Sequence, residues 1–337
     1  MSRSRVRIAG VAASIPSGRR SSREVEEMVV ANSPGSRIPK GIVEQMTGIR
    51  CRPVADESVM SSDLAADAAR RVLASTGTDA SEIGLLIFAS ASQDLLEPAT
   101  ANIVQEKTGT SCPVFDIKNA CNSFLCGVQV AESLILTGAC RKALVATGEI
   151  PSRSIKWSVT DREDFKLSFP GYTFGDAGAA ALLELSTDGS GIDHRAFQTV
   201  SRFWDVGTLP GGGSMHPRGD EFSYFRGDGA RLKDAFAEVG PGIIYEALAA
   251  TGTEFADYRR FLVHQVAMPF FKDFLKHSGV PGDRVVLTLP EYGNLAAATL
   301  PVGYALAAGR GEIAPGDRVM WIGLAGGISV GVLCMTV

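Results

Sequence analysis

The sequence predicts an α/β protein with a large buried core. Short apolar runs bounded by turn residues alternate with stretches of helical periodicity from one end of the chain to the other. Hydrophobic residues make up 45% of the 337 positions and charged residues 21%, which excludes disordered, collagen-like and coiled-coil proteins. The formal net charge of −4 is too small to indicate binding to nucleic acid or to an anionic membrane. The partner is therefore expected to be a small molecule or another protein.

The predicted elements follow one another in a regular order. Residues 5–13 form the first predicted strand, because their apolar stretch is too short for a signal peptide and is broken before Pro16. Helices are predicted at 61–76 and 122–136, where apolar or small residues recur at helical spacing. Further strands are predicted at apolar runs flanked by turn residues, at 83–90, 143–148, 179–185, 261–264 and 319–324.

A turn-rich segment divides the chain near its middle. This segment, STDGSG at 186–191, is the nearest approach to a linker. We therefore predict an N-terminal half at 1–185 and a C-terminal half at 186–337.

The two halves share a spacing. In the first half a predicted strand ends near Ala91, and Cys121 follows 30 residues later at a helix start. In the second half a strand ends at His264, and Asn294 follows 30 residues later before an apolar run. This repeated order of strand, loop and helix indicates an internal duplication, with both strand ends around one crevice.

The cysteines and histidines show no metal-ligand spacing. Six cysteines and four histidines are scattered along the chain without the paired spacing of a metal site. This pattern is typical of free thiols in a reducing compartment. No uninterrupted apolar run reaches the roughly 18 residues that a membrane-spanning helix needs. We predict a cytoplasmic protein without a metal or a redox cofactor.

Cys121 is the first candidate catalytic residue. In DIKNACNSFLCG a strand-like stretch leads through a tight turn into an apolar helix that starts at Cys121. The helix dipole and the free amides there stabilise a thiolate, so we expect a lowered pKa and a thiol that can accept an acyl group. The alternative is a buried cysteine packed as a small hydrophobic residue, which is the interpretation we prefer for Cys112, Cys126 and Cys140.

His264 and Asn294 are the other two candidates. His264 follows an apolar strand, at the end where sites of α/β proteins are usually built, and Asn294 lies between a glycine turn and a run of small residues. Each also has a structural interpretation, as a strand-terminal histidine or as a helix cap. Together with Cys121 they suit chemistry that passes through an enolate or an oxyanion, because both neutral groups can donate hydrogen bonds to negative charge. A cysteine–histidine hydrolase would use the same residue types.

Five segments, in order, resemble the β-ketoacyl-acyl-carrier-protein synthase III branch of the thiolase superfamily. They are NACNSF around Cys121, FGDAGAAALL from Phe174, VHQVAMPFF around His264, GNLAAATLP around Asn294, and GDRVMWIGLAGGISVG near the end. The resemblance implies the five-layered αβαβα thiolase fold, built from two similar halves, and a homodimer.

The resemblance also implies roles for individual residues. Cys121 would carry an acyl group as a thioester, and His264 and Asn294 would bind the thioester oxygen of the second substrate. The backbone amides of Gly326 and Cys121 would hold the oxyanion of acyl transfer. The substrates would be acyl thioesters of acyl carrier protein or coenzyme A, and no cofactor is implied.

The chain departs from the family's pattern in two places. The usual HQAN reads HQVA at 264–267, so the asparagine that supports the catalytic loop is absent. Ile42 and Met46 replace the tryptophan and arginine that grip coenzyme A in fatty-acid members, which favours a carrier protein as donor. Lys233 and Lys276 lie where related enzymes present a basic face to an acidic carrier protein, although both could be ordinary solvated lysines.

Glu97, in SQDLLEPAT, distinguishes branches of the superfamily. Enzymes that initiate fatty-acid synthesis lack this acid, whereas the segment resembles the thiolases of olefin pathways, which join two acyl chains head to head, and the pyrone-forming ketosynthases. In those relatives the glutamate reaches across the dimer and can remove an α-proton, a step that a decarboxylating malonyl donor makes unnecessary. The alternative is structural, because an acid beside Pro98 is a common helix start.

We therefore predict a homodimeric acyltransferase that loads an acyl chain on Cys121 and forms a carbon–carbon bond with a second acyl thioester, in fatty-acid-derived or polyketide-type biosynthesis. The condensation is non-decarboxylative if Glu97 is the base and decarboxylative without it. One alternative ends in acyl transfer to an alcohol or amine through the same acyl-cysteine. Another is a non-catalytic partner subunit, against which the intact Cys121, His264 and Asn294 count.

Overall fold

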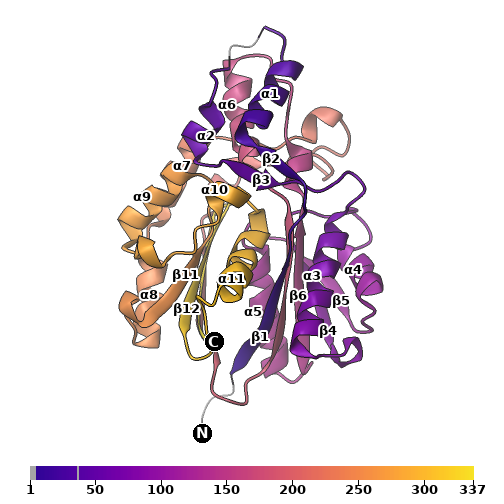
Figure 1. The fold of residues 1–337 in the computed structure, drawn as a ribbon, viewed down its shortest axis with the longest axis vertical. Helices are drawn as coiled ribbons and strands as arrows, with labels where there is room; N and C mark the ends of the chain where they lie inside the picture. Colours follow the sequence, from indigo (N-terminus) through magenta and orange to yellow (C-terminus); the bar gives the residue numbers. More distant parts are fainter. Residues whose placement is uncertain (1–4, 36–37) are drawn as a thin grey trace.

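Two mixed β-sheets stand side by side at the centre of the computed structural model, which describes residues 5–35 and 38–337 (Figure 1). In its spatial order the first sheet contains β1 (Val6–Ser14), β7 (Ala177–Leu185), β6 (Lys142–Glu149), β4 (Leu85–Ala89) and β5 (Val114–Ile117). The second contains β11 (Tyr258–Val263), β12 (Arg318–Ala325), β13 (Ser329–Thr336) and β8 (Gly191–Thr199).

The two sheets repeat one pairing pattern. In the first sheet β4 and β6 are parallel, and β6, β7 and β1 continue as antiparallel pairs. In the second sheet β11 and β12 are parallel, and β12, β13 and β8 continue as antiparallel pairs. An internal duplication predicts a shared pattern of this kind. In it, β4 is equivalent to β11 and β6 is equivalent to β12.

Helices form three layers around the sheets (Figure 1). The outer layer on the first sheet contains α3 (Ser61–Thr76) and α4 (Thr100–Thr108), the middle layer α5 (Ser123–Leu136) and α11 (Thr299–Gly309), and the outer layer on the second sheet α8 (Gly242–Thr251) and α9 (Met268–Ser278). The expected order of five layers, αβαβα, is therefore present.

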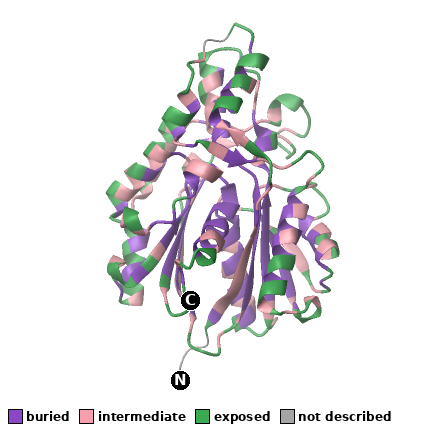
Figure 2. Ribbon diagram, viewed as in Figure 1, coloured by how far each residue is buried: buried purple, intermediate pink, exposed green. Residues whose placement is uncertain are grey.

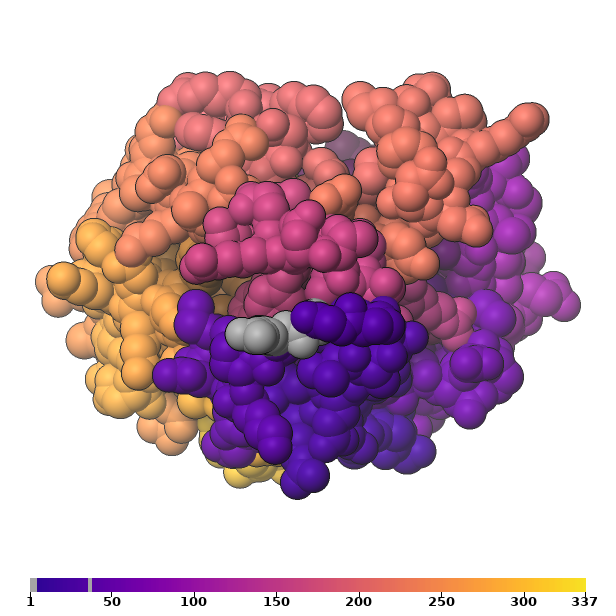
Figure 3. Space-filling model, turned by 90° about the horizontal axis from the view of Figure 1, so that it is seen from above, coloured from indigo at the N-terminus to yellow at the C-terminus, as the bar shows by residue number. Residues whose placement is uncertain are grey.

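Further helices and two short strand pairs cover the end of the molecule where the N-terminal helix lies. They are α1 (Ser22–Asn32), α2 (Ile42–Thr47), α6 (Arg162–Ser168), α7 (Gly229–Val239), α10 (Leu289–Tyr292), and the strand pairs β2 (Arg19–Ser21) with β3 (Cys51–Pro53) and β9 (Gly207–Thr208) with β10 (Arg226–Gly227). Seen from above in Figure 3, this end brings N-terminal segments in indigo, middle segments in magenta and orange-pink segments from later in the chain into one surface.

The largest core joins the two halves through the middle layer. Buried residues concentrate in both sheets and in the helices between them (Figure 2). Trp321 of β12 is fully buried, with its ring centroid 6.1 Å from that of Phe124 in α5 and 5.5 Å from that of Tyr304 in α11. Since these rings come from both halves, neither sheet can move away from the other without exposing them.

The predicted elements correspond closely to the observed ones. All six predicted strands are present, the helix predicted at 61–76 is α3, and the helix predicted at 122–136 begins one residue later as α5. The strands β8 and β13 were not predicted. The chain passes from the first sheet to the second between Leu185 and Gly191, through the turn-rich segment.

Candidate active site

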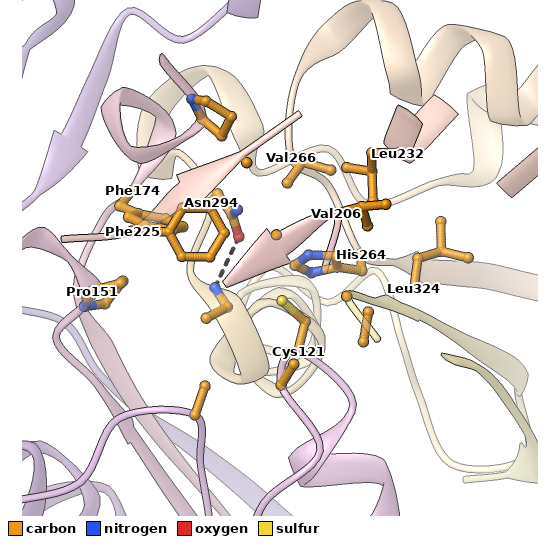
Figure 4. A pocket seen from close by; sticks show the side chains of 18 of the residues that line it. Cys121, Pro151, Phe174, Val206, Phe225, Leu232, His264, Val266, Asn294 and Leu324 are labelled. Carbon is orange, nitrogen blue, oxygen red and sulfur yellow. Dashed lines mark hydrogen bonds between the residues drawn. The ribbon is translucent and has the colours of Figure 1, made fainter. Parts of the chain in front are cut away.

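One cavity of about 790 Å³ is lined by five of the predicted site residues: the four expected at the reaction centre, Cys121, His264, Asn294 and Gly326, and the expected carrier-protein contact Lys233. Cys121 lies in the turn before α5, His264 directly after β11, Asn294 between α10 and α11, and Gly326 in the loop between β12 and β13. In Figure 4 the side chains of Cys121, His264 and Asn294 point toward one space. The fold therefore brings together residues from both halves that the sequence separates widely.

The rest of the cavity wall is mainly apolar. One side is formed by side chains from α7, α8, α9 and neighbouring segments, namely Val206, Leu232, Phe236, Ile244, Phe270, Phe271 and Phe274. Pro151, Phe174 and Phe225 line the other side (Figure 4). This apolar part of the wall suits an apolar ligand, while polar and charged side chains such as Asp94, Lys118 and Arg153 line other parts of the cavity.

The turn that carries Cys121 is closed by local contacts. Ala120 has a φ of +46°, in the left-handed region that non-glycine residues rarely adopt. Ser123 Oγ donates to the carbonyl oxygen of Ala120 at 2.7 Å and accepts from the backbone N–H of Asn119 at 2.8 Å. These bonds stabilise the strained backbone and hold the thiol at the start of α5.

The prediction of a lowered pKa for Cys121 is wrong. Burial raises the pKa of this thiol to about 12, and the charge of Glu149 contributes in the same direction. The backbone amide at the helix start lowers the pKa but does not offset the burial. The thiol is therefore uncharged at neutral pH and needs a proton acceptor when it reacts.

Glu149 is a buried carboxylate at the cavity that our sequence analysis did not single out. It ends β6, and its Oε1 accepts hydrogen bonds from Ser90 Oγ at 2.8 Å and from the Ala91 N–H at 2.7 Å. Its Oε2 accepts from the Ser92 N–H at 3.1 Å and from Ser92 Oγ at 2.8 Å. Burial raises the pKa of this carboxyl against the effect of these bonds. The signal in the sequence is an acidic residue that directly follows the buried run ALVATG at 143–148.

His264 is held as a neutral imidazole. Its side chain is almost fully buried, and its backbone N–H donates to the carbonyl oxygen of Ile322 at 2.9 Å, which fixes the end of β11 to β12. Burial lowers the pKa of His264 to about 4. Its Nδ1 has no hydrogen-bond partner within the part of the chain that the structure describes. A neutral imidazole can accept a proton from a thiol or donate an N–H to an oxygen.

Gln265 supports the loop that follows β11. Its Oε1 accepts from the backbone N–H groups of Thr288 and Leu289, each at 3.1 Å, and its Nε2 donates to the Val286 carbonyl oxygen at 2.8 Å. Ala267, at the position where the family pattern has asparagine, makes no side-chain bond at the start of α9. A buried glutamine therefore holds the loop in which the expected asparagine is absent.

Asn294 presents its amide nitrogen to the cavity. Its backbone N–H donates to the Thr173 carbonyl oxygen at 2.8 Å, and its carbonyl oxygen accepts from the Gly175 N–H at 3.0 Å. Gly293 has a φ of +66°, and a Cβ there would lie 2.6 Å from the Thr173 oxygen, so this approach requires glycine. Asn294 Oδ1 accepts from the Ala296 N–H at 3.0 Å, the dashed line in Figure 4. The Nδ2 group is thus the end that can donate to a ligand.

Three predicted site residues lie away from this catalytic cluster. Glu97 is exposed between β4 and α4 and is not among the cavity-lining residues of the described chain. Lys233 of α7 lines the cavity at some remove and pairs with Asp273 of α9, with 3.4 Å between Nζ and Oδ2. Lys276 is exposed on α9. Glu97 therefore lies outside the cavity lining of its own chain.

Within residues 5–35 and 38–337, the structure shows no cluster of three or more histidine, cysteine or acidic side chains that could hold a metal ion. No helix in the same residues is both long enough and apolar enough to cross a membrane.

Family comparisons agree with the resemblance seen in the sequence. The family model of 3-oxoacyl-[acyl-carrier-protein (ACP)] synthase III matches residues 115–201, and the model of its C terminal matches residues 248–337. β-Ketoacyl-[acyl-carrier-protein] synthase III of Syntrophomonas wolfei is 29% identical over 333 residues, which cover 97% of this chain and 96% of the relative. The same enzyme of Neisseria meningitidis serogroup C is 32% identical over 291 residues, which cover 86% of this chain and 88% of the relative.

Solved structures of Xanthomonas campestris OleA are similar along the whole chain. A cysteine-to-serine variant with bound lauric acid and lauroyl-CoA has a TM-score of 0.89 and 25% sequence identity, and the match covers 99% of both chains. Cerulenin-bound OleA has a TM-score of 0.89 and 26% identity, covering 99% of this chain and 97% of OleA. The predicted thiolase fold is confirmed by this likeness.

Proposed function

This chain belongs to the β-ketoacyl-[acyl-carrier-protein] synthase III family of condensing acyltransferases, and we propose that it carries an acyl group on Cys121 and joins it to a second acyl thioester in a Claisen condensation. The observation that carries this proposal is the convergence of Cys121, His264, Asn294 and Gly326 on one apolar cavity. The proposed setting is fatty-acid-derived or polyketide-type biosynthesis by a homodimer, with the donor on a carrier protein or coenzyme A.

Acyl transfer to Cys121 is the first step. As the sulfur attacks the thioester carbonyl, the neutral thiol gives its proton to the neutral imidazole of His264. The backbone N–H groups of Cys121 and Gly326 bind the oxyanion that forms. Collapse of this intermediate breaks the carbon–sulfur bond of the donor, whose thiolate takes the proton from His264 and leaves as a thiol.

Condensation then requires a carbanion beside acyl-Cys121. The Nδ2 of Asn294 and a ring N–H of His264 hold the oxygen of the second thioester as its enolate forms. The α-carbon attacks the acyl carbonyl, which forms the carbon–carbon bond and displaces the sulfur of Cys121 as a thiolate. This thiolate takes up a proton, which restores the free thiol. The low pKa of His264 supports this role, because an uncharged imidazole can donate to the enolate without bringing a fixed positive charge into the apolar cavity.

Glu97 of a second copy is the proposed base for a reaction without decarboxylation. In its own chain the carboxylate is exposed and apart from the cavity, as a group that acts across a dimer would be. OleA has been solved with lauroyl-CoA bound. A saturated acyl thioester of that class has no carboxyl group to lose, so its enolate requires a base that removes an α-proton.

Product analysis with two classes of donor tests this proposal. The enzyme is incubated with lauroyl thioester alone, or with lauroyl and malonyl thioesters together, and the products are identified by mass spectrometry. We expect a β-keto product from lauroyl thioester alone, and we expect Glu97→Gln to abolish it. Glu106→Gln, which changes an exposed acid on α4, is the matched control and should retain it.

Two outcomes of this experiment would contradict parts of the proposed function. A β-keto product that forms only with malonyl thioester, at the same rate in wild type and Glu97→Gln, would refute the role of Glu97 and leave the condensation intact. Acylated Cys121 that yields no β-keto product with either donor would refute condensation.

A further inference from the structure

Asn122, the residue after the proposed nucleophile, connects the two halves of the molecule beside the cavity. Its side chain is fully buried, and its Nδ2 donates to the carbonyl oxygen of Ser329 at 3.0 Å and to Ser329 Oγ at 2.9 Å. Asn122 precedes α5 in the first half, and Ser329 begins β13 in the second sheet. The two bonds therefore cross from one half to the other next to Cys121.

Helix capping does not explain this asparagine. Asn122 occupies the N-cap position of α5, where an asparagine oxygen usually accepts a backbone N–H of the first turn. Here the side chain makes no capping hydrogen bond, and Oδ1 has no partner in the described part of the chain. A buried acceptor without a donor destabilises a folded protein. An apolar side chain at this position would have no such cost.

The neighbouring strand is shaped to admit the same side chain. A Cβ at Gly323 of β12 would overlap Asn122 Oδ1, so the strand can approach Asn122 this closely only with a glycine there. Gly323 is paired with Gly331 of β13, which places a second residue without a side chain beside it. The site therefore combines an unsatisfied amide oxygen with a backbone that makes room for it.

The bonds of Asn122 fix the hairpin that carries Gly326. Ala325, the last residue of β12, pairs with Ser329, the first residue of β13, and Gly326 is the first residue of the loop between them. Cys121 directly precedes Asn122, and Gly326 directly follows Ala325. The two bonds to Ser329 therefore connect, by a short path, the two backbone amides assigned to the oxyanion hole.

We propose that Asn122 is a positioning residue that sets the separation between the N–H groups of Cys121 and Gly326, a role that rests on the proposed acyl transfer to Cys121. Oxyanion stabilisation depends on this geometry: loss of one donor slows such reactions about 10²- to 10³-fold, and a displacement of about 1 Å can cost about 10²-fold. Loss of the Asn122 amide leaves both donors present but less well placed. We expect acylation of Cys121 to slow by about 10- to 100-fold.

Two reactions of the same thiol separate positioning from general disturbance. Acylation by lauroyl-CoA passes through an oxyanion, whereas alkylation by iodoacetamide displaces iodide and does not. Asn122→Leu keeps the branch at Cγ and the number of side-chain heavy atoms without the amide, and Asn122→Ala is a second variant that leaves space instead of filling it. Ser133→Ala is the matched control, because the Ser133 hydroxyl of α5 accepts from Arg195 of β8 at 3.4 Å, another bond between the halves.

We expect both Asn122 variants to acylate about 10- to 100-fold more slowly than wild type and to be alkylated within about twofold of it. Ser133→Ala should match wild type in both reactions. Equal acylation in wild type and Asn122 variants would overturn the inference, and so would acylation and alkylation that fall together. A wild type that takes no acyl group from lauroyl-CoA or from lauroyl-acyl carrier protein would instead overturn the proposed function, and the role of Asn122 with it.

Discussion

Because burial and the charge of Glu149 raise the pKa of Cys121, we predict that this thiol is alkylated slowly, by an amount that can be calculated. A thiol with a pKa of about 12 has roughly 3,000-fold less thiolate at pH 7.5 than a free cysteine with a pKa of about 8.5. The thiolate of the weaker acid is also more nucleophilic. On a logarithmic scale, this higher nucleophilicity cancels a fraction of about 0.4 to 0.5 of the difference in thiolate concentration. The rate constant for alkylation of Cys121 by iodoacetamide should therefore be about 50- to 130-fold below that of free cysteine.

Alkylation measured by mass spectrometry from pH 6 to pH 10 provides the assay. The rate should rise about tenfold with each pH unit over the whole range, because the thiol stays below its midpoint throughout. Glu149→Gln removes a negative charge that helps to raise the pKa of Cys121, so this variant should react several-fold faster at pH 8. Glu106→Gln, on the exposed surface of α4, should leave the rate unchanged.

Two results would refute this reasoning. A rate that reaches a plateau below pH 8, above the rate of free cysteine, would mean that a thiolate is stabilised by the helix dipole or by an imidazolium. An unchanged rate in Glu149→Gln would remove the effect assigned to that carboxylate.

Three further predictions concern the other groups. Asn294→Ala should leave acylation of Cys121 within about threefold of wild type but slow condensation about 10²-fold, as product formation will show, because the amide acts on the enolate; equal loss in both steps would contradict this. The pKa of His264 is about 4 when folded and about 6.5 when unfolded, so its contribution to stability is complete above pH 6.5 and is lost as the pH falls toward 4. When the pH falls from 7 to 4.5, the free energy of unfolding measured with urea should decrease by about 2.5 kcal/mol more in the wild type than in His264→Gln. An equal decrease in both proteins would contradict the burial of a neutral imidazole. Trp321→Ala should lower the free energy of unfolding by about 3–5 kcal/mol, because the ring is fully buried against the rings of Phe124 in α5 and Tyr304 in α11; a loss under about 1 kcal/mol would contradict that packing.

Local pattern was enough to predict the central strands of both sheets and the helices α3 and α5. The spacing of apolar residues in α3 and the apolar runs of the central strands are properties of neighbouring residues, so they are visible in the sequence. The strand β8 was missed because it carries charged and polar residues such as Asp193 and Arg195, and most of it is only half-buried in the second sheet. Its pairing with β13 depends on a distant part of the chain.

The site residues also divide into those that local sequence reveals and those that depend on distant parts of the chain. Cys121, His264 and Asn294 could be found because each stands at the end of an element and within a recognisable motif. Glu149 was missed although it ends a predicted strand, because its four hydrogen bonds come from the segment after β4, which only folding brings beside the end of β6. The pKa of Cys121 was mispredicted for a related reason, since the helix start is visible in the sequence whereas burial by the other half is not.

Intact-protein mass spectrometry after incubation with acyl-coenzyme A and acyl-carrier-protein thioesters tests the central claim, that Cys121 carries the acyl group. We expect a mass increase equal to one acyl group on the wild type and none on Cys121→Ala, with the donor class identified by which thioester reacts. An equal adduct on both proteins would place the acyl group on another residue, and no adduct from any donor would contradict the proposed chemistry and favour a non-catalytic subunit.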